Sequence, residues 1–120
     1  MKIIANQISE SNNTSVYVIN INVEKRIKNN IKIKVFRILQ ELITNNIKHA
    51  KASEITIQFS EDKDELNVMI EDDGIGFDIK KINYGLGLTN IEKRLTSLAG
   101  KINIDTSPGN GTTIILTIPL

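Results

Sequence analysis

A carboxylate, two amides, an ammonium and an imidazole occur close together between residues 41 and 49. Glu41, Asn45 and Lys48 are three or four residues apart, so a helix would place them on one stripe of its surface. His49, the only histidine of the chain, falls between that stripe and the apolar side. Oxygen ligands suit Mg²⁺, and an ammonium can act as a point charge on phosphate. The stripe is typical either of a magnesium–phosphate site or of the solvated side of an amphipathic helix.

Asp72 is a second candidate group, because it ends a segment in which apolar and polar residues alternate. In a strand, Leu66, Val68, Ile70 and Asp72 would share one face, which turns the carboxylate toward the core. A buried carboxylate without a donor costs several kcal/mol, so this placement suits a ligand pocket better than a structural role. The exocyclic amine of adenine would be such a donor, and guanine does not present it at that position.

Glycines gather in three clusters, at residues 72–76, 85–88 and 109–112. Gly74 and Gly76 would let the backbone approach a ligand without an intervening side chain. The second cluster opens a predicted helix, so its backbone N–H groups would face an anion. The chain has no P-loop pattern, and Asn90 stands where a dinucleotide fingerprint needs its third glycine. The third cluster follows Pro108, which also predicts a turn between two strands.

These motifs, in this order, resemble the nucleotide pocket of the GHKL superfamily of ATPases, and above all the ATPase domain of bacterial sensor histidine kinases. Glu41 and Asn45, with the K-H-A that follows, resemble the N box of that family, and residues 72–76 resemble its D-x-G-x-G box. The run T-N-I-E-K-R-L after the second cluster resembles the branch paired with NarL-type response regulators. Residues 77–84 would form a short lid, again as in that branch. The resemblance covers about residues 31–120.

The resemblance implies that the chain binds Mg-ATP. Asn45 would be the Mg²⁺ ligand, and Asn46 suits that role less because it projects onto the apolar side. Asp72 would select adenine. Glu41 and Asn45 would be the catalytic residues, with Glu41 either orienting a group in the metal shell or assisting proton removal. The implied nucleotide-binding residues are Asn45, Lys48, His49, Asp72, Gly74, Gly76, Gly85, Leu86, Gly87, Leu88, Gly111, Thr112 and Thr113.

The implied function is that of the catalytic ATP-binding domain of a histidine kinase. Such a domain donates the γ-phosphate to a histidine on a separate dimerisation domain, and a response regulator is an indirect partner. His49 cannot be that acceptor, since it lies inside the nucleotide motif. We therefore expect the isolated chain not to autophosphorylate. The alternative is an anti-sigma-factor-like serine kinase that sequesters a partner; an ATP-gated clamp such as gyrase would need further domains and a longer lid.

The elements that must position these groups follow from the periodicity. Residues 1–13 are a leading segment with little periodic signal, and the polar residues 9–15 predict a loop. A strand at residues 14–23 and a basic connector at 24–34 precede a helix from about residue 31 to 50. The apolar face of that helix is predicted to hold Val35, Phe36, Leu39, Leu42, Asn46, Ala50, Ile43 and Ile47.

The rest of the chain predicts two hairpins and a second helix. Strands at residues 55–60 and 66–72 flank a turn at 61–65, and a loop covers 74–87. The second helix runs over residues 88–99 and is stopped by Gly100. A last hairpin pairs residues 102–106 with 112–118. We predict an α+β fold of two layers, the Bergerat type in the family, with helices packed on one face of a mixed, mostly antiparallel sheet.

Length and composition fit a single domain over residues 1–120. The chain is 40% hydrophobic and 24% charged, and its net charge of +1 argues against nucleic acid as a partner. It has no cysteine, which excludes disulfides and fits a reducing compartment. No apolar run approaches the roughly 18 residues of a membrane span. We therefore expect a cytoplasmic location without membrane contact by this chain; a membrane-anchored parent protein is left open.

Overall fold

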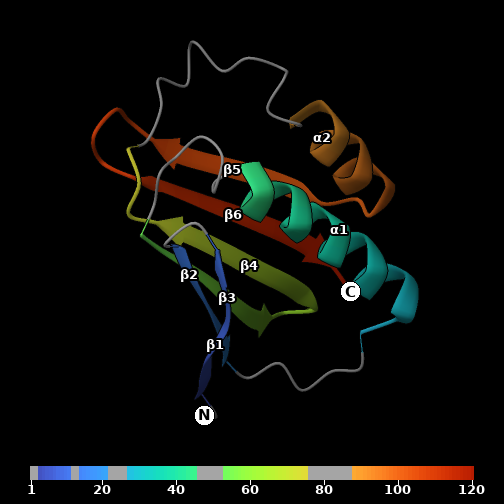
Figure 1. Cartoon of the computed structure of the whole chain (residues 1–120). Coiled ribbons are helices and arrows are strands. Elements are labelled where there is room, and N and C mark those ends of the chain that lie inside the picture. Colours follow the sequence, from blue (N-terminus) through green and yellow to red (C-terminus); the bar gives the residue numbers. More distant parts are fainter. Residues whose placement is uncertain (1–2, 12–13, 22–26, 46–52, 76–87) are drawn as a thin grey trace.

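The computed structural model describes residues 3–11, 14–21, 27–45, 53–75 and 88–120. Six strands and two helices lie within these ranges (Figure 1). In chain order they are β1 (Ile3–Ser11), β2 (Thr14–Ile21), α1 (Asn29–Asn45), β3 (Glu54–Asp62), β4 (Glu65–Asp72), α2 (Leu88–Ser97), β5 (Lys101–Thr106) and β6 (Thr112–Pro119).

The strands form one sheet in the order β1-β2-β3-β4-β6-β5. Only β2 and β3 run parallel, and α1 makes the crossover between them; the other neighbours are antiparallel. Both helices lie on the same face of the sheet (Figure 1). The prediction of a two-layer α+β fold with a mixed, mostly antiparallel sheet is confirmed. None of the helices in the described ranges is long and apolar enough to cross a membrane.

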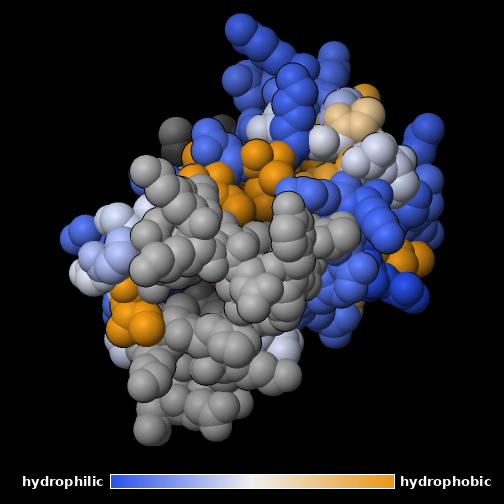
Figure 2. Space-filling model, turned by 90° about the horizontal axis from the view of Figure 1, so that it is seen from above, coloured by the Kyte–Doolittle hydropathy of each residue, from blue (hydrophilic) through white to orange (hydrophobic). Residues whose placement is uncertain are grey.

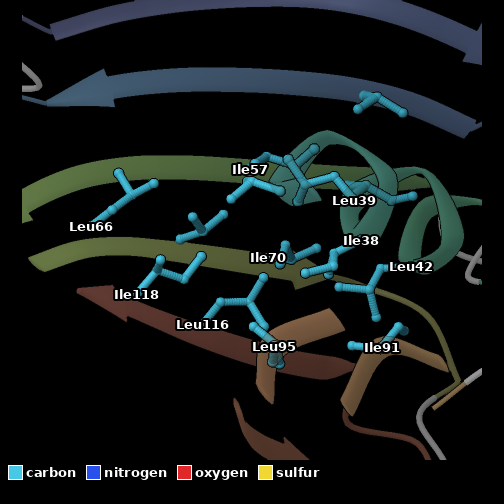
Figure 3. Packing of buried hydrophobic residues seen from close by; sticks show 14 residues of the cluster. Ile38, Leu39, Leu42, Ile57, Leu66, Ile70, Ile91, Leu95, Leu116 and Ile118 are labelled. Carbon is cyan, nitrogen blue, oxygen red and sulfur yellow. The ribbon is translucent and has the colours of Figure 1, made fainter. Parts of the chain in front are cut away.

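The core lies between the sheet and the helices. Strand alternation turns every second residue of β3, β4 and β6 inward, and the helices add residues spaced by three or four. Ile38 of α1 and Ile91 of α2 are completely buried, and both point toward the sheet (Figure 3). Full burial of one such side chain contributes about 1.5–3 kcal/mol. The core therefore fixes both helices relative to the strand ends that carry the candidate site.

The first strand is the element that the sequence analysis missed. β1 pairs antiparallel with β2, and a register shift separates Gln7 from Ser9. The predicted loop at residues 9–15 is wrong, because Ser9 and Glu10 pair with Val16 and Ser15. β1 is an edge strand, so it has a neighbour on one side only. Its pairing rests on backbone groups that every sequence carries, which explains why the periodicity was weak.

α1 begins at Asn29, so the second half of the predicted basic connector belongs to the helix. Val35, Leu39 and Leu42 are buried as predicted, but Phe36 is 61% exposed and Ile38 takes a place in the core. Residues 35, 38, 39 and 42 follow the helical spacing of a single stripe, and Phe36 falls outside it. The predicted apolar face was therefore too wide on one side. Its members Asn46, Ile47 and Ala50 lie outside the described residues.

Two tight turns complete the frame. The turn between β3 and β4 was predicted to span residues 61–65, but it consists of Lys63 and Asp64 alone. Their φ values of 48° and 64° are positive, as a type I′ hairpin turn requires. α2 ends in a Schellman motif, since Gly100 N donates to Leu95 O (2.8 Å) and Ala99 N to Thr96 O (3.1 Å). Ala99, not Gly100, takes the left-handed conformation, with φ of 54°. Gly100 is needed for space, because a Cβ there would lie 3.2 Å from Thr117 O.

Candidate functional site

The candidate site is built where the end of β4 meets the starts of β3 and β6. The register places Asp72 opposite Ile55 on one side and opposite Thr112 on the other. Thr106, the last residue of β5, lies opposite Thr112 in turn. The first and third glycine clusters are therefore neighbours in space, although more than thirty residues separate them in the sequence. The sheet brings them together at one end of the molecule (Figure 1).

Asp72 is the half-buried last residue of β4 and lies on the same face as buried Leu66, Val68 and Ile70. The predicted orientation of this strand is thus confirmed. The Gly74 backbone N donates to Asp72 Oδ1 at 2.8 Å. This bond fixes the orientation of the carboxylate and stabilises the bend by which the chain leaves β4. Asp72 therefore presents a carboxylate with a defined orientation on the helix-facing side of the sheet.

Gly111 lets the third glycine cluster pack directly against Asp72. Its φ is +69°, and a Cβ built there would lie 2.4 Å from Asp72 O. Any other residue would clash with backbone as well as adopt a left-handed conformation. Gly109 N donates to Ile75 O at 2.5 Å, which joins the same turn to the segment after β4. The two clusters therefore meet in one corner at the end of β4, against the backbone of Asp72.

Thr112 and Thr113 lie on opposite faces of the sheet. Thr112 is 5% exposed, and its Oγ1 shares a hydrogen bond of 2.9 Å with Thr106 Oγ1. It faces the same side as Asp72. Thr113 pairs in register with Glu71 and faces the side away from the helices. There it lines a shallow hollow with Thr56 and Glu71. Of the two predicted threonines, the structure thus brings only Thr112 to the face of Asp72.

Asp73 is an anchoring residue that the sequence analysis did not single out. Its Oδ1 accepts hydrogen bonds from Ser53 N (2.8 Å) and Glu54 N (3.0 Å), and its Oδ2 accepts one from Ser53 Oγ (2.5 Å). The Ser53 hydroxyl, together with these backbone N–H groups, holds the pKa of Asp73 below its ordinary value, although burial acts in the opposite sense. Asp73 ties the start of β3 to the end of β4. The adjacent Asp-Asp pair at a strand end was the available signal.

Glu41 lies on α1 where that helix faces α2. Its Oε1 is 3.5 Å from Nη2 of Arg94, and the two side chains are 29% and 33% exposed. Its Oε2 is buried and has no hydrogen-bond partner within the described ranges. Arg94 was not predicted as a site residue. It directly precedes Leu95, a buried residue of α2. This neighbouring position was the signal that Arg94 would approach α1.

The remaining predicted residues are described in part or not at all. Asn45 is the last residue of α1, one turn beyond Glu41, and Leu88 is the first residue of α2. The second glycine cluster therefore precedes a helix directly, as predicted. Six predicted site residues lie outside the described ranges: Lys48, His49, Gly76, Gly85, Leu86 and Gly87.

Known proteins share both the sequence pattern and the fold. Residues 30–120 match the family described as histidine kinase-, DNA gyrase B- and HSP90-like ATPase. Over 97 residues the chain is 39% identical to the signal transduction histidine-protein kinase/phosphatase DegS of Brevibacillus brevis, covering 80% of this chain and 25% of that protein. It is 34% identical over 88 residues to the kinase/phosphatase UhpB of Salmonella typhimurium, covering 73% of this chain and 17% of that protein.

Among solved structures, the chain is similar to the blue-light activated histidine kinase of Erythrobacter litoralis EL346. The TM-score is 0.77 at 23% sequence identity, and the match covers 88% of this chain and 35% of that one. This likeness concerns the fold alone. The chain spans about a quarter of the length of the DegS protein that it matches.

Proposed function

Because the chain belongs to the family of histidine kinase-, DNA gyrase B- and HSP90-like ATPases, we propose that it is the catalytic ATP-binding domain of a sensor histidine kinase. The family resemblance inferred from the motifs is confirmed by this match and by the DegS and UhpB relatives. Since these relatives are histidine kinases, the anti-sigma-factor-like alternative is not favoured. One observation carries the proposal most directly: Gly111 of the third cluster packs against the Asp72 backbone, while Gly74 N of the first cluster holds the Asp72 carboxylate.

In this proposal ATP binds against that corner with its base toward Asp72. An ionised carboxylate accepts a hydrogen bond from the amine of adenine, and Thr112, opposite Asp72 in the neighbouring strand, lies on the same side of the sheet. Asn45 would hold Mg²⁺, Lys48 and His49 would contribute to nucleotide binding, and the N–H groups at residues 85–88 would hold the phosphates. From above, a group of hydrophobic atoms is exposed next to strongly hydrophilic side chains (Figure 2).

The transfer step asks for little covalent chemistry from the protein. A phosphoryl group passes between two nucleophiles in line, and the protein contributes positioning and charge stabilisation. Glu41 and Asn45 are one helical turn apart on α1, a spacing that lets two residues of a helix serve one site. Mg²⁺, when bound, neutralises charge that develops on the phosphates. Glu41 supplies a carboxylate that orients a neighbouring group or accepts a proton.

The acceptor histidine belongs to a separate dimerisation domain, and the response regulator is reached through that domain. α1 offers a surface for such a helical partner. Phe36 and Ile33 are 61% and 56% exposed on it, and Phe36 borders an apolar groove with Val35, Leu39 and Leu66. The site is cytoplasmic in this proposal, since ATP and response regulators are found there. Neither nucleic acid nor membrane is a partner of the chain itself.

Calorimetric titration with Mg-ADP and with Mg-GDP tests the proposal. We expect Mg-ADP to bind at least about tenfold more tightly, because a hydrogen bond to a charged group contributes about 1.5–3 kcal/mol. Asp72→Asn should lose that preference. Asp62→Asn is the matched control, since it makes the same change at the opposite end of the sheet, and it should bind like the wild type. Absence of binding, or equal affinity for the two bases in the wild type, would overturn the proposal.

A further inference from the structure

We infer that Arg94 is a positioning residue of the catalytic site. It engages one oxygen of Glu41 and so fixes the orientation of the other oxygen, a buried acceptor without a partner among the described residues. The inference rests on the proposed function, which places Glu41 in the catalytic machinery. Nothing in the motifs that carry the family resemblance assigns a role to Arg94.

The backbone that carries Arg94 is held firmly by the core. Its helical neighbours Ile91 and Leu95 are buried, and both point toward the sheet beside Leu42 of α1 (Figure 3). Leu42 is also the residue next to Glu41. The two charged side chains therefore extend from adjacent, well-packed turns of α1 and α2. Their approach of 3.5 Å is a consequence of how the two helices pack.

The contact involves only one carboxylate oxygen. An arginine that serves as a structural tether usually binds a carboxylate through two parallel N–H···O bonds, which satisfies both oxygens. Here Nη2 approaches Oε1, while Oε2 is buried and has no hydrogen-bond partner in the part of the chain that the structure describes. A buried carboxylate oxygen without a donor is unfavourable. Such an atom is expected where a donor arrives with a ligand.

A purely structural role predicts different behaviour. Partly exposed ion pairs contribute little to stability, so loss of this pair should hardly affect folding. Loss of the orientation of Glu41 should instead slow the chemical step, because a misplaced acceptor no longer meets its donor in the transition state. Nucleotide affinity should stay nearly constant, since Asp72 and the first and third glycine clusters adjoin the ends of β4 and β6 and not Arg94. The two roles can therefore be separated by kinetics.

The test uses the full kinase that contains this chain, with initial rates of autophosphorylation measured against ATP concentration. We expect Arg94→Gln to lower kcat by roughly tenfold to a hundredfold, the range seen when a supporting residue of a site is removed, with KM changed less than about twofold. Arg94→Lys keeps the charge and should recover part of the rate. Lys93→Gln, which removes an exposed charge from the next position of α2, should match the wild type.

A double-mutant cycle provides the decisive comparison. If Arg94 acts through Glu41, Glu41→Gln combined with Arg94→Gln should be no slower than Glu41→Gln alone. Independent, multiplicative losses would overturn the inference, and so would an unchanged kcat in Arg94→Gln or a loss explained by a lowered melting temperature. Mg-ADP titration of the same variants keeps this outcome apart from the proposed function: failure of the wild type to bind Mg-ADP refutes the function, whereas normal binding with multiplicative rate losses refutes only the role of Arg94.

Discussion

Asp73 accepts three hydrogen bonds from the first two residues of the segment that begins β3. Because these donors stabilise its ionised form, the pKa of Asp73 is lower in the folded than in the unfolded chain. The stability that it contributes is therefore present above the unfolded value of about 3.9 and is lost as the pH falls through the folded value. Ser53 and Asp73 thus make the joint between β3 and β4 sensitive to acid.

We expect Asp73→Asn to lower the free energy of unfolding by on the order of 1 kcal/mol at neutral pH, the usual net value of such hydrogen bonds. The difference from the wild type should shrink as the pH is lowered from neutral to a value below the lowered folded pKa of Asp73, because the wild-type carboxylate is then neutral as well. Urea denaturation at both pH values measures it. Asp105→Asn, on the exposed side of β5, is the control. A difference of constant size at both pH values would contradict the prediction.

Gly111 and Gly109 form a matched pair, because both have positive φ but only Gly111 lies against backbone. Gly109→Ala should lose about 1–2 kcal/mol from its left-handed conformation alone. Gly111→Ala adds a clash with Asp72 O, so a total loss of about 2–5 kcal/mol is expected. Chemical denaturation gives both values. Equal losses at the two positions would show that the contact with Asp72 is not tight.

At the level of single residues, the orientation of Asp72 was predictable because side chains in a strand alternate with a fixed period. The proximity of Gly111 to Asp72 was expected only through the family resemblance, since no local rule joins two segments so far apart. The contacts of Asp73 and of Arg94 were missed for the same reason. Each depends on how whole elements pack, so the Asp-Asp pair and the place of Arg94 beside Leu95 were signals that did not identify the partner residue.

The C-terminal end of α2 offers a position where a substitution should raise the stability of the chain. Ala99 takes the left-handed position of the Schellman motif, which glycine usually occupies. Ala99→Gly should therefore raise the free energy of unfolding by roughly 0.5–1 kcal/mol, after the greater freedom of glycine in the unfolded chain is subtracted. Ser97→Gly, two residues earlier and within the helix, should lower it by about 0.5–1 kcal/mol. Thermal or urea unfolding of the two variants would reveal the opposite signs, and a loss in both would refute the assignment.

At the level of elements, the periodic segments were predicted well and the ends poorly. β3, β4, β5 and β6 lie within two residues of their predicted bounds, because each has one buried and one exposed face. The predicted boundary of α1 was late, since its first turn carries polar and basic residues that resemble a connector. β1 was missed altogether. It lies at the edge of the sheet, and its pairing with β2 defines it.

For the whole molecule, the central prediction is that the isolated chain binds Mg-ATP but does not phosphorylate itself. His49 lies in the nucleotide motif, so the chain offers no separate acceptor. Incubation with labelled ATP, followed by an assay for acid-labile phosphate, tests this. The full kinase serves as the positive control. Acid-labile phosphate on the isolated chain would contradict the prediction.

The crossover between β2 and β3 has a consequence for how the chain acquires its structure. β3 and β4 are joined by two residues, whereas the parallel pair β2–β3 forms only after the chain has passed through α1. Short loops close at lower entropic cost, so the hairpins β3–β4 and β5–β6 should assemble before β2 reaches its place. The corner at Asp72 would then form before the half of the molecule that carries Glu41 and Asn45. Under the proposed function, the part of the site expected to bind the base would be complete before the part expected to act on the phosphates.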